Sequence, residues 1–371
     1  MKTIVVLGAG LVGRTIAIEL SRDYQVTAVD SNSSQLKNLK EKKIKTLKAD
    51  LSSDSVIKKV VKNCDLVICA LPGFMGFKSL KSIIKAGKNV VDISFFPEDQ
   101  FLLDKLAKQK GVTAIVDCGV APGLANIILG YHNKKMKISS YKCLVGGLPY
   151  KRVWPFEYKA FFSPIDVIAE YTRPARLVFN GKVIEKPALS DPEIINYEEV
   201  GDLEAFNTDG LRSLLKTMKI PNMIEKTMRY PGHIELMKVF REVGLFSEKE
   251  IIVAGKPIRP IDLTAKLLFP FWFPEKGEKD FTILDLLIEG NKESKKVLHR
   301  YFIFDSYDPA EDNSSMARTT GFTCCAAARF LLEHQFNRKG ICPPEYLGED
   351  EHCFEFIISN LKNKGIRIDQ S

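Results

Sequence analysis

The most informative absences in this 371-residue sequence are those of paired cysteines and long apolar runs. Its eight cysteines include no C-x-x-C pair, which argues against a zinc site and, without a secretory signal, against a disulfide framework. No apolar run approaches the roughly 18 residues that span a bilayer. The nearest one, residues 267–274, is broken twice by proline. The sequence starts directly in a strand-like run, so we expect no presequence. We therefore expect a cytoplasmic protein with reduced thiols, no metal and no membrane partner.

The length and the charge distribution set further limits. At about 150 residues per domain, the length predicts two or three domains. Residues 1–125 contain 19 Lys and Arg against 12 Asp and Glu, so they carry most of the net charge of +8. These lysines are spread along helix-like segments, without a dense basic arm or interleaved aromatic residues. We expect solvated helix faces that attract an anionic cofactor, and no nucleic-acid partner.

A glycine-rich motif lies between a β-branched apolar run, residues 3–7, and a helical pattern, residues 11–20. In a G-x-G-x-x-G motif the first glycine permits the tight turn and the second lets the backbone approach a pyrophosphate, while the third lets helix and strand pack closely. The pyrophosphate then binds N–H groups at the start of the helix. The predicted phosphate-binding residues are Gly8, Gly10, Leu11, Val12 and Gly13.

An acidic residue follows the second strand-like run, residues 25–29. Asp30 stands where a carboxylate accepts hydrogen bonds from the adenosine ribose and repels a 2′-phosphate. We therefore predict NAD rather than NADP as the cofactor. The alternative is a Rossmann fold that binds no ligand.

Strand-like and helix-like segments continue to alternate up to about residue 122. Runs at 45–49, 66–71, 89–93 and 113–117 predict a doubly wound parallel sheet, whose ligands lie outside the carboxyl ends of the strands. The further cofactor contacts predicted at those ends are Asp50, Leu51, Ala70, Leu71, Pro72, Ser94 and Val120. Asp92 and Asp117 end two of the strands beside the expected nicotinamide, where we predict a substrate role. Each could instead cap the segment that follows it.

The pattern changes after residue 122. Strand-like runs, including a hairpin around Asn180–Gly181, mix with helices and predict an α+β substrate domain with an antiparallel sheet over residues 123–314. Helical patterning returns over 315–371. The predicted fold class is thus α/β, with a discontinuous NAD-binding Rossmann domain of residues 1–122 and 315–371.

Polar clusters in the later sequence supply further candidates, and each has a structural alternative. Asp209 follows Asn207 and Thr208 at a helix start, where these residues can act only as caps. His233 follows a Pro-Gly turn and could be an interior histidine. Arg318 lies near the start of a helical stretch and could be a structural arginine.

Several motifs resemble the saccharopine dehydrogenase-like family, nearly from end to end of the chain. They are residues 8–13, 92–94, 117–123, 146–149, 206–211 and 229–233. Residues 158–166 and 315–321 are most similar to the lysine 6-dehydrogenase branch. The saccharopine-forming branch carries an arginine after its Ser-Pro, where this sequence has Ile165 and Asp166. This difference favours a smaller amino acid than saccharopine.

The resemblance implies oxidation at a carbon that bears an amine. Hydride passes to NAD⁺, and water hydrolyses the resulting imine to an aldehyde and ammonia; L-lysine would give 2-aminoadipate 6-semialdehyde. The amine must be neutral, which for a lysine side chain near pH 7 costs about 4.6 kcal/mol. The candidates for proton transfer are His233, Asp92 and Asp117.

An α-carboxylate favours a guanidinium partner, and Arg173, Arg318 and Arg229 are available for it. The other predicted substrate contacts are Arg173 and Arg318, together with Tyr158 and Asp209. We expect the aspartates, His233 and Arg318 to face one cleft when the domains close, with the amino-acid substrate bridging it. We also expect a homodimer. Two rivals remain open: an NADPH-dependent enzyme that makes saccharopine-like or carboxy-polyamine secondary amines, and a nucleotide-binding regulator without turnover.

Overall fold

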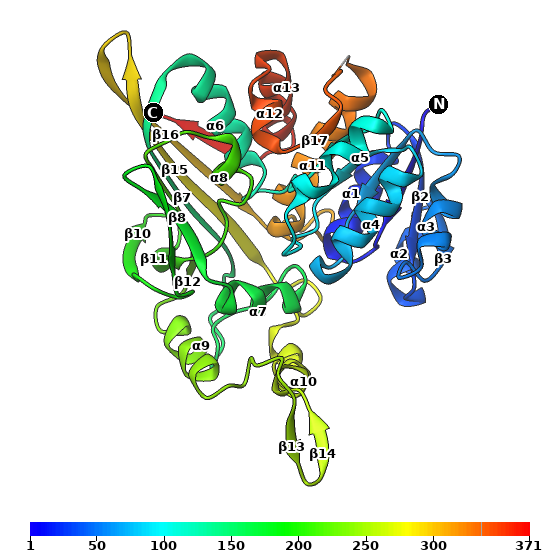
Figure 1. Ribbon diagram of the computed structural model, residues 1–371. Coiled ribbons are helices and arrows are strands. Elements are labelled where there is room, and N and C mark those ends of the chain that lie inside the picture. Colours follow the sequence, from blue (N-terminus) through cyan, green and yellow to red (C-terminus); the bar gives the residue numbers. More distant parts are fainter. Residues whose placement is uncertain (335) are drawn as a thin grey trace. The chain divides into compact units, whose positions relative to one another are not determined.

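The alternating patterns at the start of the chain form a seven-stranded parallel sheet in the order β17-β6-β5-β4-β1-β2-β3 (Figure 1). The computed structural model describes residues 1–334 and 336–371, and it divides into two units. The first unit contains Met1–Lys135 and Met316–Ile366. The second contains Met136–Ser315 and Arg367–Ser371.

The elements of the parallel sheet and its helices are β1 (Thr3–Leu7), α1 (Leu11–Leu20), β2 (Gln25–Asp30), α2 (Ser33–Glu41), β3 (Lys45–Lys48), α3 (Asp54–Val61), β4 (Leu66–Cys69), α4 (Gly73–Lys85), β5 (Asn89–Asp92), a 3₁₀ helix (Gln100–Leu103), α5 (Asp104–Gln109), β6 (Thr113–Ile115), α6 (Leu124–Lys135), α11 (Ser315–Glu333), β17 (Gly340–Cys342), α12 (Pro344–Gly348) and α13 (Glu351–Asn363).

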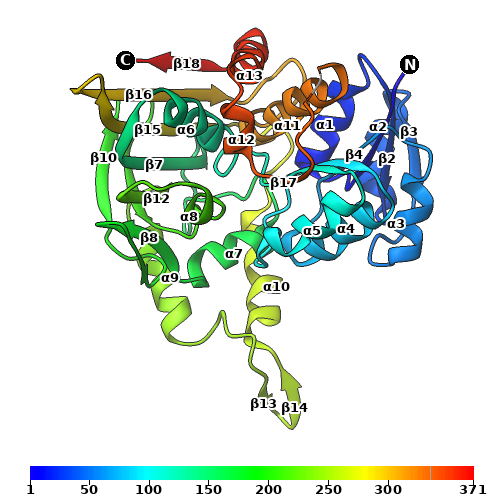
Figure 2. The ribbon, with the colours of Figure 1, turned by 45° about the horizontal axis from the view of Figure 1, so that its top comes forward.

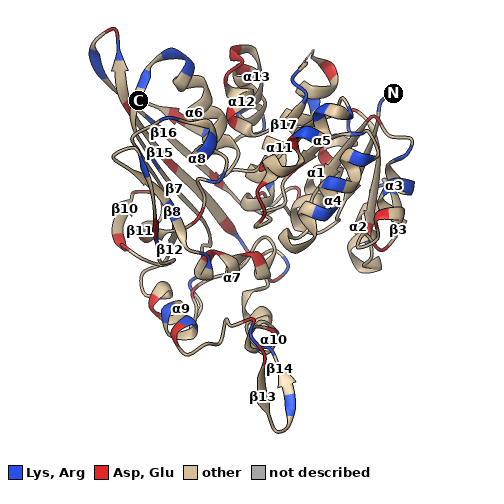
Figure 3. Cartoon of the chain, in the orientation of Figure 1, with Lys and Arg blue, Asp and Glu red and all other residues tan. Residues whose placement is uncertain are grey.

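Apolar residues on alternate sides of the strands explain why helices cover both faces. Val5, Val67 and Val90 pack in one core cluster with the inner sides of α3, α4 and α5. On α11, Cys325 packs against α1 at Ile16. The lysines of α3 and α4 lie on the outer sides of these helices, as Figure 3 shows. The α/β class with a doubly wound parallel sheet is confirmed.

The predicted domain boundaries differ from these units at two places. Helix α6 belongs to the first unit because it packs tightly on α12: a Cβ atom at Gly130 would lie 2.0 Å from the Glu345 carbonyl oxygen. At the end of the chain, β18 (Arg367–Gln370) pairs with β16 and so belongs to the second unit. Both pairings join segments that lie far apart in the sequence, so no short sequence motif predicts them.

The elements of the second unit are β7 (Lys137–Pro149), α7 (Pro164–Thr172), β8 (Ala175–Phe179), β9 (Lys182–Lys186), β10 (Glu193–Tyr197), β11 (Gly201–Asn207), α8 (Leu214–Thr217), β12 (Asn222–Arg229), α9 (His233–Glu242), β13 (Ile251–Val253), β14 (Lys256–Ile258), α10 (Pro260–Trp272), β15 (Asp280–Lys292), β16 (Lys295–Ser306) and β18.

The large sheet of the second unit has the order β10-β11-β12-β7-β15-β16-β18, and Figure 2 shows its long strands side by side. The sheet is mixed rather than purely antiparallel, because β12 pairs with β7 in parallel from Asn222 to Thr227. The long connection between them, which includes α7, makes a parallel pairing possible where a hairpin could not. The predicted hairpin at Asn180–Gly181 does join β8 and β9, and both turn residues have positive φ.

Helices α7, α9 and α10 pack together in a second apolar cluster that includes Tyr158, Tyr171 and Trp272. All eight cysteines are buried free thiols. Within the described residues, no helix combines the length and apolar character that crossing a membrane requires.

Candidate functional site

The glycine-rich turn lies where the strand order of the parallel sheet reverses, between β1 and β4. This switch point is where open α/β sheets bind their ligands. Gly8 has φ +95°, and a Cβ atom on it would lie 2.3 Å from the Ala70 carbonyl oxygen. A Cβ atom on Gly13 would lie 2.2 Å from the Gly8 carbonyl oxygen. Both positions therefore require glycine, as the motif predicts.

Gly10 differs from these two glycines, because a Cβ atom added to it would meet nothing within 4 Å. It is the N-cap of α1 and offers no side-chain hydrogen bond to the helix. The following backbone N–H groups, from Leu11 to Gly13, occupy the positive end of the helix dipole. An open space beside these donors fits the pyrophosphate of a dinucleotide.

Asp30 ends β2 beside this turn. One carboxylate oxygen accepts a hydrogen bond from the Ala9 N–H group at 2.7 Å, and the other accepts from the Asn32 N–H group at 2.8 Å. Each carboxylate oxygen has a second lone pair, so the group can still accept hydrogen bonds from a ribose.

The remaining predicted cofactor contacts lie in three different environments. Ala70, Leu71 and Pro72 follow β4 directly, at the switch point. Asp50 is exposed, and the hydrogen bond that it accepts from the Ser52 N–H group lowers its pKa below the usual range. Leu51, Ser94 and Val120 are buried, and Leu51 belongs to the apolar core. Leu51 therefore serves packing, whereas Ser94 lies beside Cys69 and Asp92.

Asp92 is fully buried at the end of β5. It accepts a hydrogen bond from the Ser94 N–H group at 2.6 Å, while Cys69 lies beside it and approaches Ser94 Oγ at 3.5 Å. Burial raises the pKa of Asp92 to about 7, and the charge of Asp117 adds to this increase while the Ser94 N–H group opposes it. Asp92 therefore changes its charge near neutral pH.

Asp117 lies in a strained segment next to this carboxyl group. Its φ is +53°, in the left-handed region that aspartate tolerates better than most residues. Gln100 Nε2 donates to it at 3.5 Å. Gly123 closes the following loop so tightly that a Cβ atom would lie 1.9 Å from the Gly119 carbonyl oxygen. Asp117 thus lies close enough to Asp92 for its charge to raise the pKa of Asp92.

Arg318 has a structural partner within the first unit. Its guanidinium donates to the Lys364 carbonyl oxygen at 2.8 Å, just after the end of α13, and lies over the Phe322 ring at 5.4 Å. A cation at a helix C-terminus is favourable because it complements the dipole. This geometry matches the structural alternative for Arg318.

His233 occupies a closed hydrogen-bonded chain inside the second unit. Its neutral ring donates from Nδ1 to the Phe156 carbonyl oxygen at 2.8 Å, and Nε2 accepts from the Tyr171 hydroxyl at 2.9 Å. Burial and the charge of Arg229 lower the pKa of His233 to about 3. The ring is therefore neutral with both nitrogens engaged, which matches the interior alternative and not a proton carrier.

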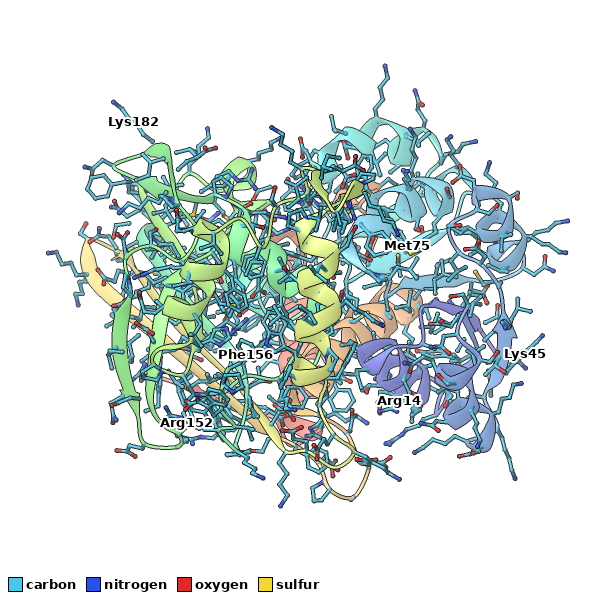
Figure 4. The ribbon with its side chains drawn as sticks, turned by 90° about the horizontal axis from the view of Figure 1, so that it is seen from below. Arg14, Lys45, Met75, Arg152, Phe156 and Lys182 are labelled. Carbon is cyan, nitrogen blue, oxygen red and sulfur yellow. The ribbon has the colours of Figure 1, made fainter. Side chains whose placement is uncertain are left out.

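Arg229 is the centre of this cluster. It donates from Nε to the Tyr171 hydroxyl at 3.1 Å and from Nη2 to Glu170 at 2.8 Å, and it lies 4.4 Å from the centre of the Tyr158 ring. Burial raises the pKa values of Glu170 and both tyrosines, while Arg229 opposes each increase. The side chain of Phe156, which is labelled in Figure 4, stacks edge-on against Trp272 at this cluster.

A second group of charges surrounds the loop after β11. Arg176 donates in a two-pronged contact to Asp209, at 2.8 and 2.7 Å, so both oxygens of this predicted substrate contact are engaged. Glu225 accepts hydrogen bonds from the Thr208 hydroxyl at 2.6 Å and the Gly210 N–H group at 3.0 Å, and burial raises its pKa to about 8.

Arg173 lies at the end of α7, half-buried. Burial lowers its pKa, and the charge of Arg212 lowers it further, while Asp166 and Asp209 oppose the change. Arg212 is buried in a left-handed backbone conformation, with φ +44°. Two guanidinium groups therefore lie near each other in this part of the second unit.

The sequence did not single out Glu170, Tyr171, Arg212 or Glu225. Tyr171 is separated from its partner Arg229 by 58 residues, and no local motif signals such a pairing. The positive φ of Arg212 gives no signal in a sequence either. Among the described residues, no group of three or more His, Cys, Asp or Glu is arranged to hold a metal ion.

Comparison with known proteins covers both units. A family model described as the saccharopine dehydrogenase NADP binding domain matches residues 4–115, and one described as the saccharopine dehydrogenase C-terminal domain matches residues 115–366. The mitochondrial alpha-aminoadipic semialdehyde synthase of Rattus norvegicus is 26% identical over an alignment of 266 residues that covers 67% of this chain. The chain spans only 29% of that protein.

Two further relatives match over nearly their full length. A saccharopine dehydrogenase [NADP(+), L-glutamate-forming] of Schizosaccharomyces pombe is 23% identical, with 100% of this chain and 99% of that protein covered. The structure of apo saccharopine dehydrogenase (L-Glu forming) from Saccharomyces cerevisiae has a TM-score of 0.79 at 20% identity and covers 100% of this chain and 99% of that one. The predicted family resemblance is confirmed, and the chain belongs to the saccharopine dehydrogenase family.

Proposed function

We propose that this protein uses NAD⁺ to oxidise the side-chain amine of an amino acid, and that the amino acid is L-lysine. The products are 2-aminoadipate 6-semialdehyde and ammonia. Family membership supports the reaction class. Ile165 and Asp166 stand after Ser163-Pro164, where the resemblance leads us to expect an arginine for saccharopine, and this supports the smaller substrate.

The position of Asp30 carries the choice of cofactor. Its carboxylate lies beside the glycine-rich turn, where it accepts a hydrogen bond from the Ala9 N–H group at 2.7 Å. Residues 31–36 contain no Lys or Arg that could neutralise a 2′-phosphate. A negative charge at this point repels that phosphate and accepts hydrogen bonds from ribose hydroxyls.

A second candidate is an NADP-dependent dehydrogenase of a secondary amine such as saccharopine. The relative from Schizosaccharomyces pombe is named as an NADP(+)-dependent saccharopine dehydrogenase, which favours this candidate. The pairing of β3 with β2 also favours it, because Lys48 stands opposite Asp30. A lysine there offers a charge for a 2′-phosphate.

The cofactor choice is tested by kcat/KM for NAD⁺ and for NADP⁺ with L-lysine. We expect NAD⁺ to be preferred, and Asp30→Ser to narrow the preference about tenfold or more, which is about 1.4 kcal/mol. Lys48→Ala is the matched control and should leave the preference unchanged. A preference for NADP⁺ that Lys48→Ala removes would support the second candidate instead.

The reaction needs a neutral amine, because the nitrogen lone pair must assist the departure of hydride. When bound, the dinucleotide supplies the hydride acceptor. Asp92 suits proton transfer, since its pKa of about 7 lies near the working pH. His233 does not suit this role, because both of its ring nitrogens are engaged. Asp92→Asn should lower kcat by ~10²–10⁴-fold, the usual effect of removing such a group.

Arg173 is the group that we assign to the substrate carboxylate. The nearby charge of Arg212 opposes that of Arg173, and a bound carboxylate relieves this repulsion. Arg173→Ala should therefore raise KM and change kcat little.

A further inference from the structure

The segment from Ile251 to Phe273, which we call the arm, exposes apolar side chains on two successive elements. It consists of the hairpin β13–β14 and helix α10. In Figures 1 and 2 the hairpin extends beyond the end of α10, away from the large sheet of the second unit. Among the residues that the structure describes, the two strands pair with each other alone and form a two-stranded sheet.

Helix α10 is apolar on two sides. Ile261, Leu268 and Trp272 are buried in the core of the second unit. Leu263, Leu267 and Phe271 follow one another at intervals of four residues on another side, and they are 51%, 62% and 56% exposed. The few charges here include Asp262, which Arg259 neutralises with hydrogen bonds of 2.6 and 2.8 Å. A helix with apolar residues on both sides is typical of one that is covered on both.

The hairpin has one open edge and one blocked edge. Ala254 and Gly255 both have positive φ and form its two-residue turn, so Val253 and Lys256 are the hydrogen-bonded pair that closes it. In the next pair, Ile252 and Pro257, the backbone groups face outward. Proline has no N–H group, so the outer edge of β14 is blocked, as at many protected edges. The outer edge of β13 presents both backbone groups of Ile252, whose side chain is 71% exposed.

We propose that the arm is a dimer interface, in which the open edge of β13 pairs antiparallel with the same edge of a second copy of this chain. A two-fold axis at Ile252 places this residue opposite its own counterpart, and it places Ile251 opposite Val253 of the second copy. The pairing is self-complementary in hydrogen bonds and in apolar side chains, as an isologous contact requires.

The available area agrees with a stable dimer. Ile251, Ile252, Val253, Leu263, Leu267, Phe271 and Phe273 are each about half exposed or more. Together they offer on the order of 600 Å² per copy, or about 1,200 Å² when two copies meet, which reaches the range of specific interfaces. A patch of this size is at the upper end of what monomers expose.

The register is tested by cross-linking of the full-length protein. Facing residues of a hydrogen-bonded antiparallel pair have Cα atoms about 5.5 Å apart, within disulfide reach. Ile252→Cys should therefore give a disulfide-linked dimer under a mild oxidant, and the eight native cysteines, all buried, should contribute little. Lys256→Cys, on the other strand, is the control and should remain mostly uncrosslinked. Equal cross-linking of both variants would overturn the register.

The interface itself is tested by sedimentation velocity at tens of micromolar. The wild type should have twice the chain mass of 41.8 kDa, and Leu267→Asp combined with Phe271→Asp should return it to the monomer. The matched control is Val183→Asp combined with Ile194→Asp, since these side chains are 54% and 56% exposed on other strands. A monomeric wild type would overturn the proposal and leave the arm for a contact within the chain. A dimer that only the control variant dissociates would place the interface elsewhere.

Discussion

The two units form their candidate sites in opposite ways. In the first unit, the candidate site for the dinucleotide is made of backbone. Gly8 and Gly13 leave no room for a side chain, and the start of α1 has no side-chain cap. In the second, the cluster is made of side chains that neutralise one another, with Arg229 held by Glu170 and Arg176 held against Asp209.

This difference determines what damages each site. A backbone site is damaged when atoms are added, because a methyl group collides with a carbonyl oxygen. A site of paired side chains is damaged when one member is removed, because a buried partner then loses its counter-charge. The carboxyl pair of Asp92 and Asp117 is the exception within the first unit, since it depends on side chains.

The largest effect is expected from removing the central charge of the second unit. Arg229→Met should destabilise the protein by about 3–5 kcal/mol, because Glu170, whose side chain is only 19% exposed, is left without its partner. Changing Glu170 to Leu in the same chain should recover most of the loss, as measured by urea unfolding. Arg259→Met removes an exposed partner of Asp262 and should cost far less stability, because water screens this pair. Equal losses in the two single variants would contradict the comparison.

The next effect concerns Asp92 and has a defined pH dependence. The pKa of Asp92 is about 7 in the folded protein and 3.8 ordinarily, so between these values the unfolded chain ionises while the folded chain keeps the proton. Stability is therefore lost as pH rises through this window, by up to about 4 kcal/mol from this group.

Asparagine does not ionise, so Asp92→Asn should not lose this stability. Free energies of unfolding measured at pH 5 and pH 8 should therefore show the variant becoming more stable relative to the wild type as pH rises. Asp65→Asn is the control. Thr3 holds the pKa of Asp65 below its usual value, so this carboxyl is ionised in the folded and the unfolded chain at both pH values, and the difference between this variant and the wild type should not change. An Asp92 variant whose difference from the wild type is the same at both pH values would contradict the assignment.

The smallest expected effects on the free energy of unfolding distinguish Gly13 from Gly10 in the glycine-rich motif. Gly13→Ala should destabilise the first unit by about 1–3 kcal/mol, because the new methyl group overpacks against the Gly8 carbonyl oxygen. Gly10→Ala should change stability by less than about 0.5 kcal/mol, because its Cβ atom meets open space. It should still weaken binding of the dinucleotide, measured by calorimetric titration. A Gly10 variant that binds normally would show that the pyrophosphate lies elsewhere.

The same contrast explains what could be predicted from the sequence. The strands and helices of the first unit, and the roles of Gly8 and Gly13, follow from local patterns within about 30 residues. The arrangement of the second unit depends on contacts between distant segments, such as Tyr171 with Arg229 and β7 with β12. Residue types alone identified Tyr158 and His233 as notable, but they did not reveal that His233 has partners at both nitrogens.

Arg318 shows the same limit. Its place near the start of α11 was visible in the sequence, but its partner, the carbonyl oxygen of Lys364, lies 46 residues further on. Charge and position therefore predict a ligand role, but they do not reveal that the guanidinium also donates to a helix end.

The most direct test of the proposed function is a single assay with purified protein, in which reduced cofactor and ammonia are measured together. With L-lysine and NAD⁺, we expect equal amounts of reduced cofactor and ammonia. Saccharopine with NADP⁺ should give neither product at a comparable rate. Reduction of NADP⁺ by saccharopine, without ammonia from lysine, would contradict the proposed function.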